Sequence, residues 1–321
     1  MGACNCRGKD MALAKKGIFY TLIAVILASI IIASFAFYST YRTKSKMFVV
    51  ETRVKTMDRF TDDLEKDIER ALYIAGFRAI LAIEDDIIAK GEYVDDAELS
   101  LREIVINGTL SGEQLNLTMN SSLSAWFESV KMHGREIGIE LNYSIIDFEV
   151  FQTDAWNVDF DITVALDIKD SKDIASWQIN DSASSQINII GFEDPVYTIG
   201  SYGRTTRVIN KSDLNATGID DLKAFLSEKT YREYPGAPSF LMRLEGDLSG
   251  SDYGIETLVD TNVLSFYELG IYDRSSVDYI YFGEQDTTDY KIYNITDVYM
   301  AGFQLDEEHV AEYGVDDFKY S

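Results

Sequence analysis

The hydrophobic pattern is strongest near the start of the chain. Residues 18–39 read IFYTLIAVILASIIIASFAFYS and contain no charged side chain. A helix of this length measures about 33 Å, enough to cross a hydrocarbon core about 30 Å thick. A surface helix of a soluble domain would show a polar face, and this segment shows none. The pattern predicts one membrane-spanning helix over residues 18–39.

A different helical pattern follows the apolar segment. Residues 47–90 contain no proline, and apolar side chains recur mostly three or four positions apart. The stripe comprises Val50, Val54, Met57, Leu64, Ile68, Leu72, Ala75 and Ala79. This spacing places the stripe on one face of a helix. We therefore predict a helical stalk over residues 40–92, whose stripe packs either on its own domain or against copies of the chain.

Two segments alternate apolar and polar residues, which is typical of half-buried antiparallel strands. In residues 156–168 the apolar set runs from Trp156 to Ile168 without interruption. Residues 137–151 also alternate, but the phase shifts so that Ile146 joins the apolar set after Ile145. Such a shift predicts a β-bulge near Ile145. The two strands are expected to form a hairpin with its turn at residues 152–155.

Weaker signals complete residues 93–321. Expected helices are 95–106, 115–132, 219–228 and a short acidic one from Asp306; expected strands are 186–190, 205–209, 278–282 and 290–299; expected turns are 191–195 and 235–238. The sequence therefore predicts an α+β protein: a transmembrane helix continuing into an amphipathic stalk helix, then a mainly antiparallel β domain with a few helices.

Charge separates the two ends of the chain. Residues 1–17 form a short basic leader or tail, whereas residues 47–321 hold 22 basic and 53 acidic residues, a net charge of −31. This surface repels phosphate backbones, so nucleic acid is not an expected partner. The only cysteines are Cys4 and Cys6. A disulfide-stapled domain is therefore excluded, which favours a prokaryotic origin.

Glycosylation motifs orient the membrane segment. Its flanking charges are nearly balanced, so they do not orient it. Eight of the eleven asparagines after residue 46 begin an Asn-x-Ser/Thr sequon: Asn107, Asn116, Asn120, Asn142, Asn180, Asn210, Asn215 and Asn294. A sequon is an acceptor only outside the cytosol. We therefore predict a glycosylated domain outside the cell (residues 93–321) and a cytoplasmic N-terminus.

The residues before the apolar segment carry a family resemblance. Lys15, Lys16 and Gly17, followed at once by Ile18 and a hydrophobic helix, resemble the class III leader of archaeal type IV pilin-like proteins. The resemblance implies cleavage after Gly17, with Lys16 beside the cut and Ile18 starting the mature chain. Leu22 stands at the fifth mature position, where bacterial type IV pilins usually carry glutamate. The alternative is an uncleaved signal anchor.

No motif for catalysis or cofactor binding is present. Phosphate-binding and GxGxxG loops and the Gly-x-Ser-x-Gly elbow are missing, and His133 and His309 are expected to be surface or capping residues. Residues 213–221 place oxygen side chains as a calcium loop would. However, Ala224 stands where the bidentate acid belongs, and Asn215 is a sequon. The competing interpretation of this segment is a helix that starts at Thr217 or Asp220. For the whole chain we predict no enzyme activity, no bound metal and no cofactor.

These observations favour a structural role. We expect a pilin-like or pseudopilin-like surface component whose partners are the lipid bilayer and copies of itself or related subunits. A non-assembling single-pass adhesion protein with an uncleaved anchor is the alternative. A third hypothesis, an extracellular hydrolase that uses paired acidic residues, is supported only by the acidic composition.

Overall fold

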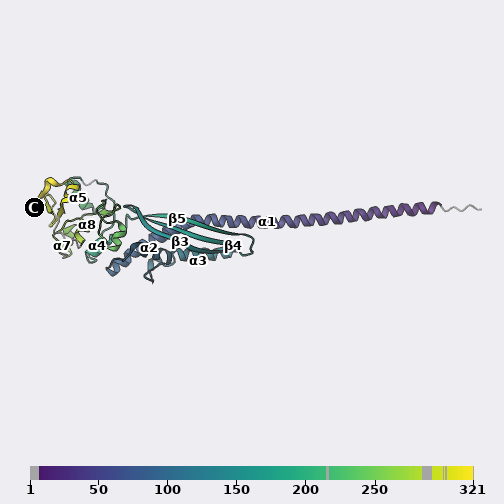
Figure 1. Ribbon diagram of the computed structural model, residues 1–321, viewed down its shortest axis with the longest axis horizontal. Helices are drawn as coiled ribbons and strands as arrows, with labels where there is room; N and C mark the ends of the chain where they lie inside the picture. Colours follow the sequence, from purple (N-terminus) through teal and green to yellow (C-terminus); the bar gives the residue numbers. More distant parts are fainter. Residues whose placement is uncertain (1–6, 215–216, 284–290, 299, 301, 321) are drawn as a thin grey trace, which may run out of the picture. The chain divides into compact units, whose positions relative to one another are not determined.

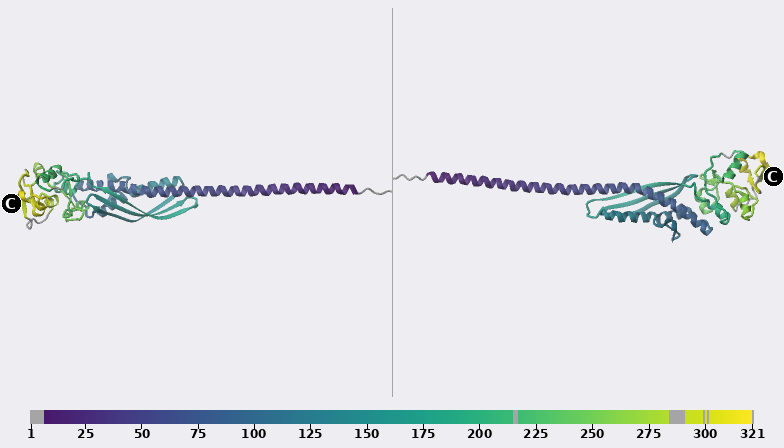
Figure 2. Two further views of the ribbon diagram at one scale, coloured as in Figure 1. Left: turned by 90° about the horizontal axis from the view of Figure 1, so that it is seen from above. Right: turned by 180° about the vertical axis from the view of Figure 1, so that it is seen from behind.

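The computed structural model describes residues 7–214, 217–283, 291–298, 300 and 302–320. It has an α+β fold with a long N-terminal helix and small antiparallel sheets (Figure 1; Figure 2). The helices are α1 Arg7–Lys90, α2 Ala97–Asn107, η1 Asn116–Thr118, α3 Leu123–Glu136, α4 Pro195–Gly200, α5 Ile219–Glu228, α6 Phe240–Glu245, α7 Thr261–Phe266, α8 Asp278–Phe282, α9 Glu307–Glu312 and η3 Asp316–Phe318. The strands are β1 Thr109–Leu110, β2 Glu113–Gln114, β3 Ile139–Asp154, β4 Asn157–Asp170, β5 Ser176–Asn188, β6 Arg232–Glu233, β7 Ile255–Glu256, β8 Ile292–Ile295, β9 Gln304–Asp306 and β10 Lys319–Tyr320.

Chain contacts group into two compact units. Residues 1–61 with 172–175 form one unit, and residues 62–171 with 176–321 form the other. The second unit holds the sheets and every helix after α1, together with the last part of α1 itself.

The apolar segment and the predicted stalk are both part of α1. From Leu64 to Ala79, the residues of the predicted stripe are buried. Within the second unit, Gly76 faces the side chains of Ile187 and Phe160 on the sheet. This part of the stripe therefore packs on its own domain. Val50 and Val54, at its start, are exposed.

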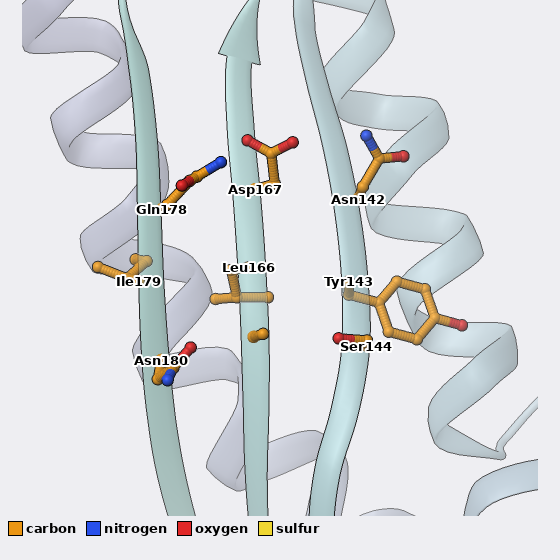
Figure 3. A pocket seen from close by; sticks show the side chains of 9 residues that line it. Asn142, Tyr143, Ser144, Leu166, Asp167, Gln178, Ile179 and Asn180 are labelled. Carbon is orange, nitrogen blue, oxygen red and sulfur yellow. The ribbon is translucent and has the colours of Figure 1, made fainter.

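The main sheet consists of β3, β4 and β5 in that order, all antiparallel. Its inner face carries the alternating apolar residues of β4, and helices lie behind that face (Figure 3). The predicted hairpin is confirmed, because β3 and β4 pair antiparallel, and the bulge is confirmed, because their register shifts between Ile145 and Asp147. The turn lies at residues 155–156 and not at 152–155, since β3 continues to Asp154. Ile146, expected on the inner face, is instead the extra residue of the bulge and is exposed.

Two predicted boundaries in this region are wrong. The helix expected over residues 115–132 begins only at Leu123, because Asn120 has φ 61° and Ser122 caps the helix by accepting from the Ala125 N–H. The strand expected over residues 186–190 is β5, which begins ten residues earlier at Ser176. Its many Ser, Asn and Gln residues hid the alternation.

The C-terminal elements partly match the predictions. Helices α2, α5 and α9 and the turn at residues 235–238 are confirmed. The strand expected over residues 278–282 is wrong, because this segment is the helical turn α8. Residues 205–209 form only an isolated bridge, from Val208 to Glu193. Of the strand expected over residues 290–299, β8 is confirmed, while residues 290 and 299 lie outside the described residues.

Candidate functional sites on the N-terminal helix and the folded domain

The N-terminal part of α1 is a candidate membrane span. Among the described residues, α1 is the one helix long and apolar enough to cross a membrane, and none of its most apolar window is buried. Large side chains such as Ile26, Ile31 and Phe35 are at least half exposed. A contiguous apolar surface of this kind is unfavourable in water and marks a contact with lipid or with another protein.

The three residues of the predicted processing site lie in α1. Gly17 is exposed, and no atom lies within 4 Å of a Cβ built on it. The side chains of Lys16 and Ile18 are outside the described residues. Because the peptide bond after Gly17 lies in a helix, a protease must unwind this turn to reach it. Cleavage at this position stays a prediction.

Two further apolar surfaces lie on α1 beyond residue 39. Met47, Phe48 and Val49 are more than half exposed, just after the basic residues that flank the apolar segment. The second surface, which we call the Tyr73 patch, consists of Tyr73, Ile74 and Phe77, with exposed fractions of 48%, 51% and 39%. The Tyr73 and Phe77 rings stack with centroids 6.4 Å apart. The Phe77 ring also packs on the Phe192 ring, with centroids 5.3 Å apart, so the second surface is partly covered by its own domain.

Seven of the eight predicted acceptor asparagines lie in the described residues. Six of them have exposed side chains: Asn107, Asn116, Asn120, Asn142, Asn180 and Asn210. Asn294 is half-buried in β8, between β9 and β10, and Asn215 lies outside the described residues. Exposure of the acceptor is compatible with a glycan at six positions, and glycosylation stays a prediction.

Two of these asparagines line one hollow on the outer face of the main sheet (Figure 3). Asn142 on β3 and Asn180 on β5 lie on either side of β4. Asn142 pairs across the sheet with Asp167 on β4, which pairs in turn with Gln178 on β5. The hollow measures about 490 Å³. Glycans at both positions would cover this polar face of the sheet.

Residues 213–221, considered above as a calcium loop, include the N-terminus of helix α5. Gly218, with φ 110°, is the N-cap of α5, so neither Thr217 nor Asp220 takes that role as expected. Asp221 accepts a hydrogen bond from the backbone N–H of Thr217 at 3.3 Å. Throughout the described residues, no three His, Cys, Asp or Glu side chains are grouped to hold a metal ion.

A buried charge cluster joins three elements of the folded domain. One guanidinium nitrogen of Arg243 donates to Asp194 and to Asp278, at 2.7 Å each, and all three side chains are fully buried. The Tyr231 hydroxyl donates to Asp194 at 2.8 Å. Burial raises the pKa of Asp278 to about 6, even though Arg243 lowers it. Removing Arg243 would leave two buried carboxylates without their counter-ion.

A second buried cluster contains His309, which the sequence placed on the surface or at a cap. Its Nδ1 contacts Asp306 at 2.8 Å and its Nε2 contacts Glu256 at 3.1 Å. Burial lowers the pKa of His309, but the hydrogen bonds to these two carboxylates outweigh it and raise the pKa to about 10. Burial raises the pKa of Asp306, but His309 outweighs this effect and lowers it to about 2. The prediction of a surface position for His309 is therefore wrong, because the ring is buried and contacts Glu256, which lies 53 positions earlier in the chain.

This cluster does not have the arrangement of a nucleophilic site. The hydroxyl of Ser275 donates to Asp306 at 2.6 Å and not to His309, and both residues are buried. A catalytic serine would need the imidazole as its base and access to substrate. The one sequence signal of the cluster is the Asp306–His309 spacing. Asp306 caps α9 by accepting from the His309 N–H.

A buried carboxyl group on α1, in the second unit, lies near the acidic residues Glu193 and Asp194. The side chain of Glu84 is buried, and burial raises its pKa to about 9. Its Oε1 atom has no hydrogen-bond partner among the described residues. Glu84 is therefore protonated in the folded protein at neutral pH.

Comparison of the chain with protein-family models, with curated proteins and with solved structures finds no match.

Proposed function

We propose that this chain is an exported, membrane-anchored surface protein that serves as a pilin-like structural subunit. The observation that carries the proposal is α1. Within this one helix, an exposed apolar segment precedes a segment whose stripe is built into the folded domain. A helix of this kind anchors the chain in lipid at one end and holds the folded domain at the other.

The orientation rests on the sequons and the charge. Six described acceptor asparagines are exposed, as a glycan requires, and they are spread from Asn107 to Asn210. The acidic composition keeps the folded domain soluble and discourages binding to anionic lipid. We therefore place the N-terminus in the cytoplasm and residues 93–321 outside the cell.

Self-association is supported by apolar surface that the chain leaves open. Met47, Phe48 and Val49 extend the apolar surface past the basic residues at the end of the span. The Tyr73 patch adds a further exposed apolar surface within the second unit. Surfaces like these are stabilised by packing against another protein. Cleavage after Gly17 would remove the basic leader and with it charges that hold the helix in the membrane.

The buried charge clusters have a structural role in this proposal. Arg243 is fully buried and His309 nearly so, and their partners are carboxylates of the same domain. Groups this deeply buried have no access to a substrate, so they act on the stability and uniqueness of the fold.

Mass spectrometry of the native N-terminus tests the processing step. We expect a mature chain that begins at Ile18 in the native host, and an uncut chain in the double variant Lys15→Ala/Lys16→Ala. The matched control is Arg42→Ala/Lys44→Ala, which removes two charges on the other side of the span. A native chain that still begins at or near Met1 contradicts the pilin-like processing.

Site-specific photo-crosslinking in native membranes tests assembly. A benzophenone side chain at Tyr73 or Phe48 is expected to form products at multiples of the subunit mass. The same probe at Asp63, an exposed polar position of α1, is the control. A protein that stays monomeric at high concentration and gives no product from Tyr73 or Phe48 would instead be a non-assembling adhesion protein with a signal anchor.

A further inference from the structure

A second concave site lies in the folded domain, away from the sheet and the N-terminal helix surfaces. We call it the tyrosine pocket; it measures about 880 Å³. Its chemically distinctive lining residues are Tyr93, Tyr202, Tyr272, Phe282, Arg274 and Asp247. They come from the segments after α1, α4 and α6, from the loop before α8, and from α8 itself. A volume of this size suits a small-molecule ligand.

Two of the rings are fixed by close contact with glycine backbone. Gly200 is covered by the Phe282 ring, and Gly246 by the Tyr93 ring, so closely that a Cβ at either glycine would overlap the ring. Gly246 also has φ 71°, a conformation that side chains rarely adopt. These contacts form the pocket wall before any ligand binds, which reduces the entropy lost on binding.

The other two rings are presented to solvent. Tyr202 is 76% exposed and has φ 55°, a conformation uncommon for a bulky residue. Tyr272 is 42% exposed, and its backbone N–H donates to the Tyr281 hydroxyl at 3.2 Å. An exposed ring on an unfavourable backbone conformation, as at Tyr202, is more typical of a ligand site than of a core.

The polar groups of the pocket carry one charge of each sign. The Arg274 guanidinium donates to the backbone carbonyls of Tyr281 and Gly283 at the end of α8, and lies 5.3 Å from the Tyr272 ring centroid. Asp247 is exposed, and its Oδ1 accepts from the Ser249 N–H at 2.9 Å. Arg274 is thus held in place beside an aromatic face, with Asp247 lining the same pocket.

We propose that the tyrosine pocket binds the neutral pyranose ring of a saccharide. The C–H face of a pyranose is apolar and weakly positive, so it packs on the negative face of an aromatic ring. Its hydroxyls both donate and accept, which suits Asp247 and Arg274 together. Arg274 disfavours a cationic ligand in this pocket. Asp247 and the net charge of −31 over residues 47–321 disfavour an anionic one.

This site goes beyond the proposed structural role and does not depend on it. The test uses the full chain in phospholipid nanodiscs, because maltoside or glucoside detergents would themselves supply a sugar. Binding is measured on an array of neutral glycans and by saturation-transfer NMR with methyl glucoside, methyl galactoside, methyl mannoside and N-acetylglucosamine. The array tests binding of glycans that are linked at their reducing end, as in a glycoprotein. The NMR experiment tests binding of free sugars in solution.

The variants are chosen to keep the fold. Tyr202→Asn removes a ring but tolerates the positive φ, Tyr272→Ala removes the second exposed ring, and Tyr253→Ala is an exposed tyrosine outside the pocket. We expect binding of at least one neutral saccharide, weakened about tenfold by either pocket variant and unchanged in the control. Three outcomes overturn the proposal: no neutral glycan binds in either assay, binding survives both pocket variants, or tetramethylammonium competes for the site.

Discussion

Gly76 of α1 and Ile187 of β5 lie in direct contact. A Cβ atom built on Gly76 would come within 2.7 Å of the Ile187 Cδ1 atom. The same Cβ would lie 3.2 Å from the Cε2 atom of Phe160 on β4. Both neighbours are fully buried. Glycine at this position therefore sets how closely the helix approaches the sheet, although it is an unfavourable residue in a helix.

A larger residue at position 76 should separate α1 from the sheet. We expect Gly76→Val to destabilise the folded domain by about 2 kcal/mol, because overpacking forces core side chains out of their rotamers. Gly76→Ala should be closer to neutral, since its gain of about 1 kcal/mol in helix propensity offsets a smaller overlap. Urea unfolding followed by tryptophan fluorescence measures both, as the tryptophans lie within residues 126–177. The exposed Arg78→Val is the control, and equal midpoints for it and Gly76→Val would refute the packing argument.

Glu84 should make the protein less stable as the pH rises. Its folded pKa of about 9 lies above the ordinary 4.5, so between these values the folded state keeps a proton that the unfolded state releases. Stability therefore falls with rising pH across this window. We expect Glu84→Gln to raise the free energy of unfolding at pH 7.5 by about 4 kcal/mol, seen as a higher urea midpoint, and to match the wild type near pH 4. The control is Glu65→Gln, at an exposed position of the same helix, which should leave the free energy of unfolding unchanged at both pH values.

His309 should stabilise the folded domain up to alkaline pH. Its pKa is raised from 6.5 to about 10 in the folded state, so its contribution is complete below pH 6.5 and is lost as the pH rises through about 10. His309→Gln leaves the buried Asp306 without its cation, while Glu256 keeps its ion pair with Arg232 at 2.7 Å. We expect a loss of about 3 kcal/mol at pH 7. Thermal unfolding at pH 7 and pH 10 measures the effect. His133→Gln, at the other histidine, which is exposed, is the control. If both variants melt alike at pH 7, the buried ion pairs contribute nothing.

Two substitutions in one sequon separate glycosylation from folding. Asn116 is exposed, whereas the hydroxyl of Thr118 is buried and donates to the Gly108 carbonyl at 2.7 Å. Asn116→Gln and Thr118→Ala should both remove the same glycan, seen as one equal mass decrease by intact-protein mass spectrometry. Only Thr118→Ala should also destabilise the domain, by about 1 kcal/mol, because it removes one hydrogen bond to the Gly108 carbonyl, which keeps those from the Leu115 N–H and the Gln114 amide. An unchanged mass in both variants would show that Asn116 carries no glycan.

The sequence by itself determined the elements that bury one face. The stripe from Leu64 to Ala79 and the alternation of residues 156–168 record local geometries of 3.6 and 2 residues per repeat. The segment over residues 18–39 has no such period, and its length and lack of charge indicate the helix instead. Even the bulge beside Ile145 was visible as a change of phase. These features depend on neighbours along the chain, so a single sequence contains them.

Only the tertiary structure decided the environment of the polar residues and of the short C-terminal elements. Asp278 pairs with Arg243, 35 positions earlier, and His309 contacts Glu256, 53 positions earlier. The aromatic run at residues 278–282 favours a strand by propensity. It forms the helical turn α8 instead, with Asp278 fixed by the buried guanidinium. Pairings across such distances depend on the packing of the whole domain, which no local pattern records.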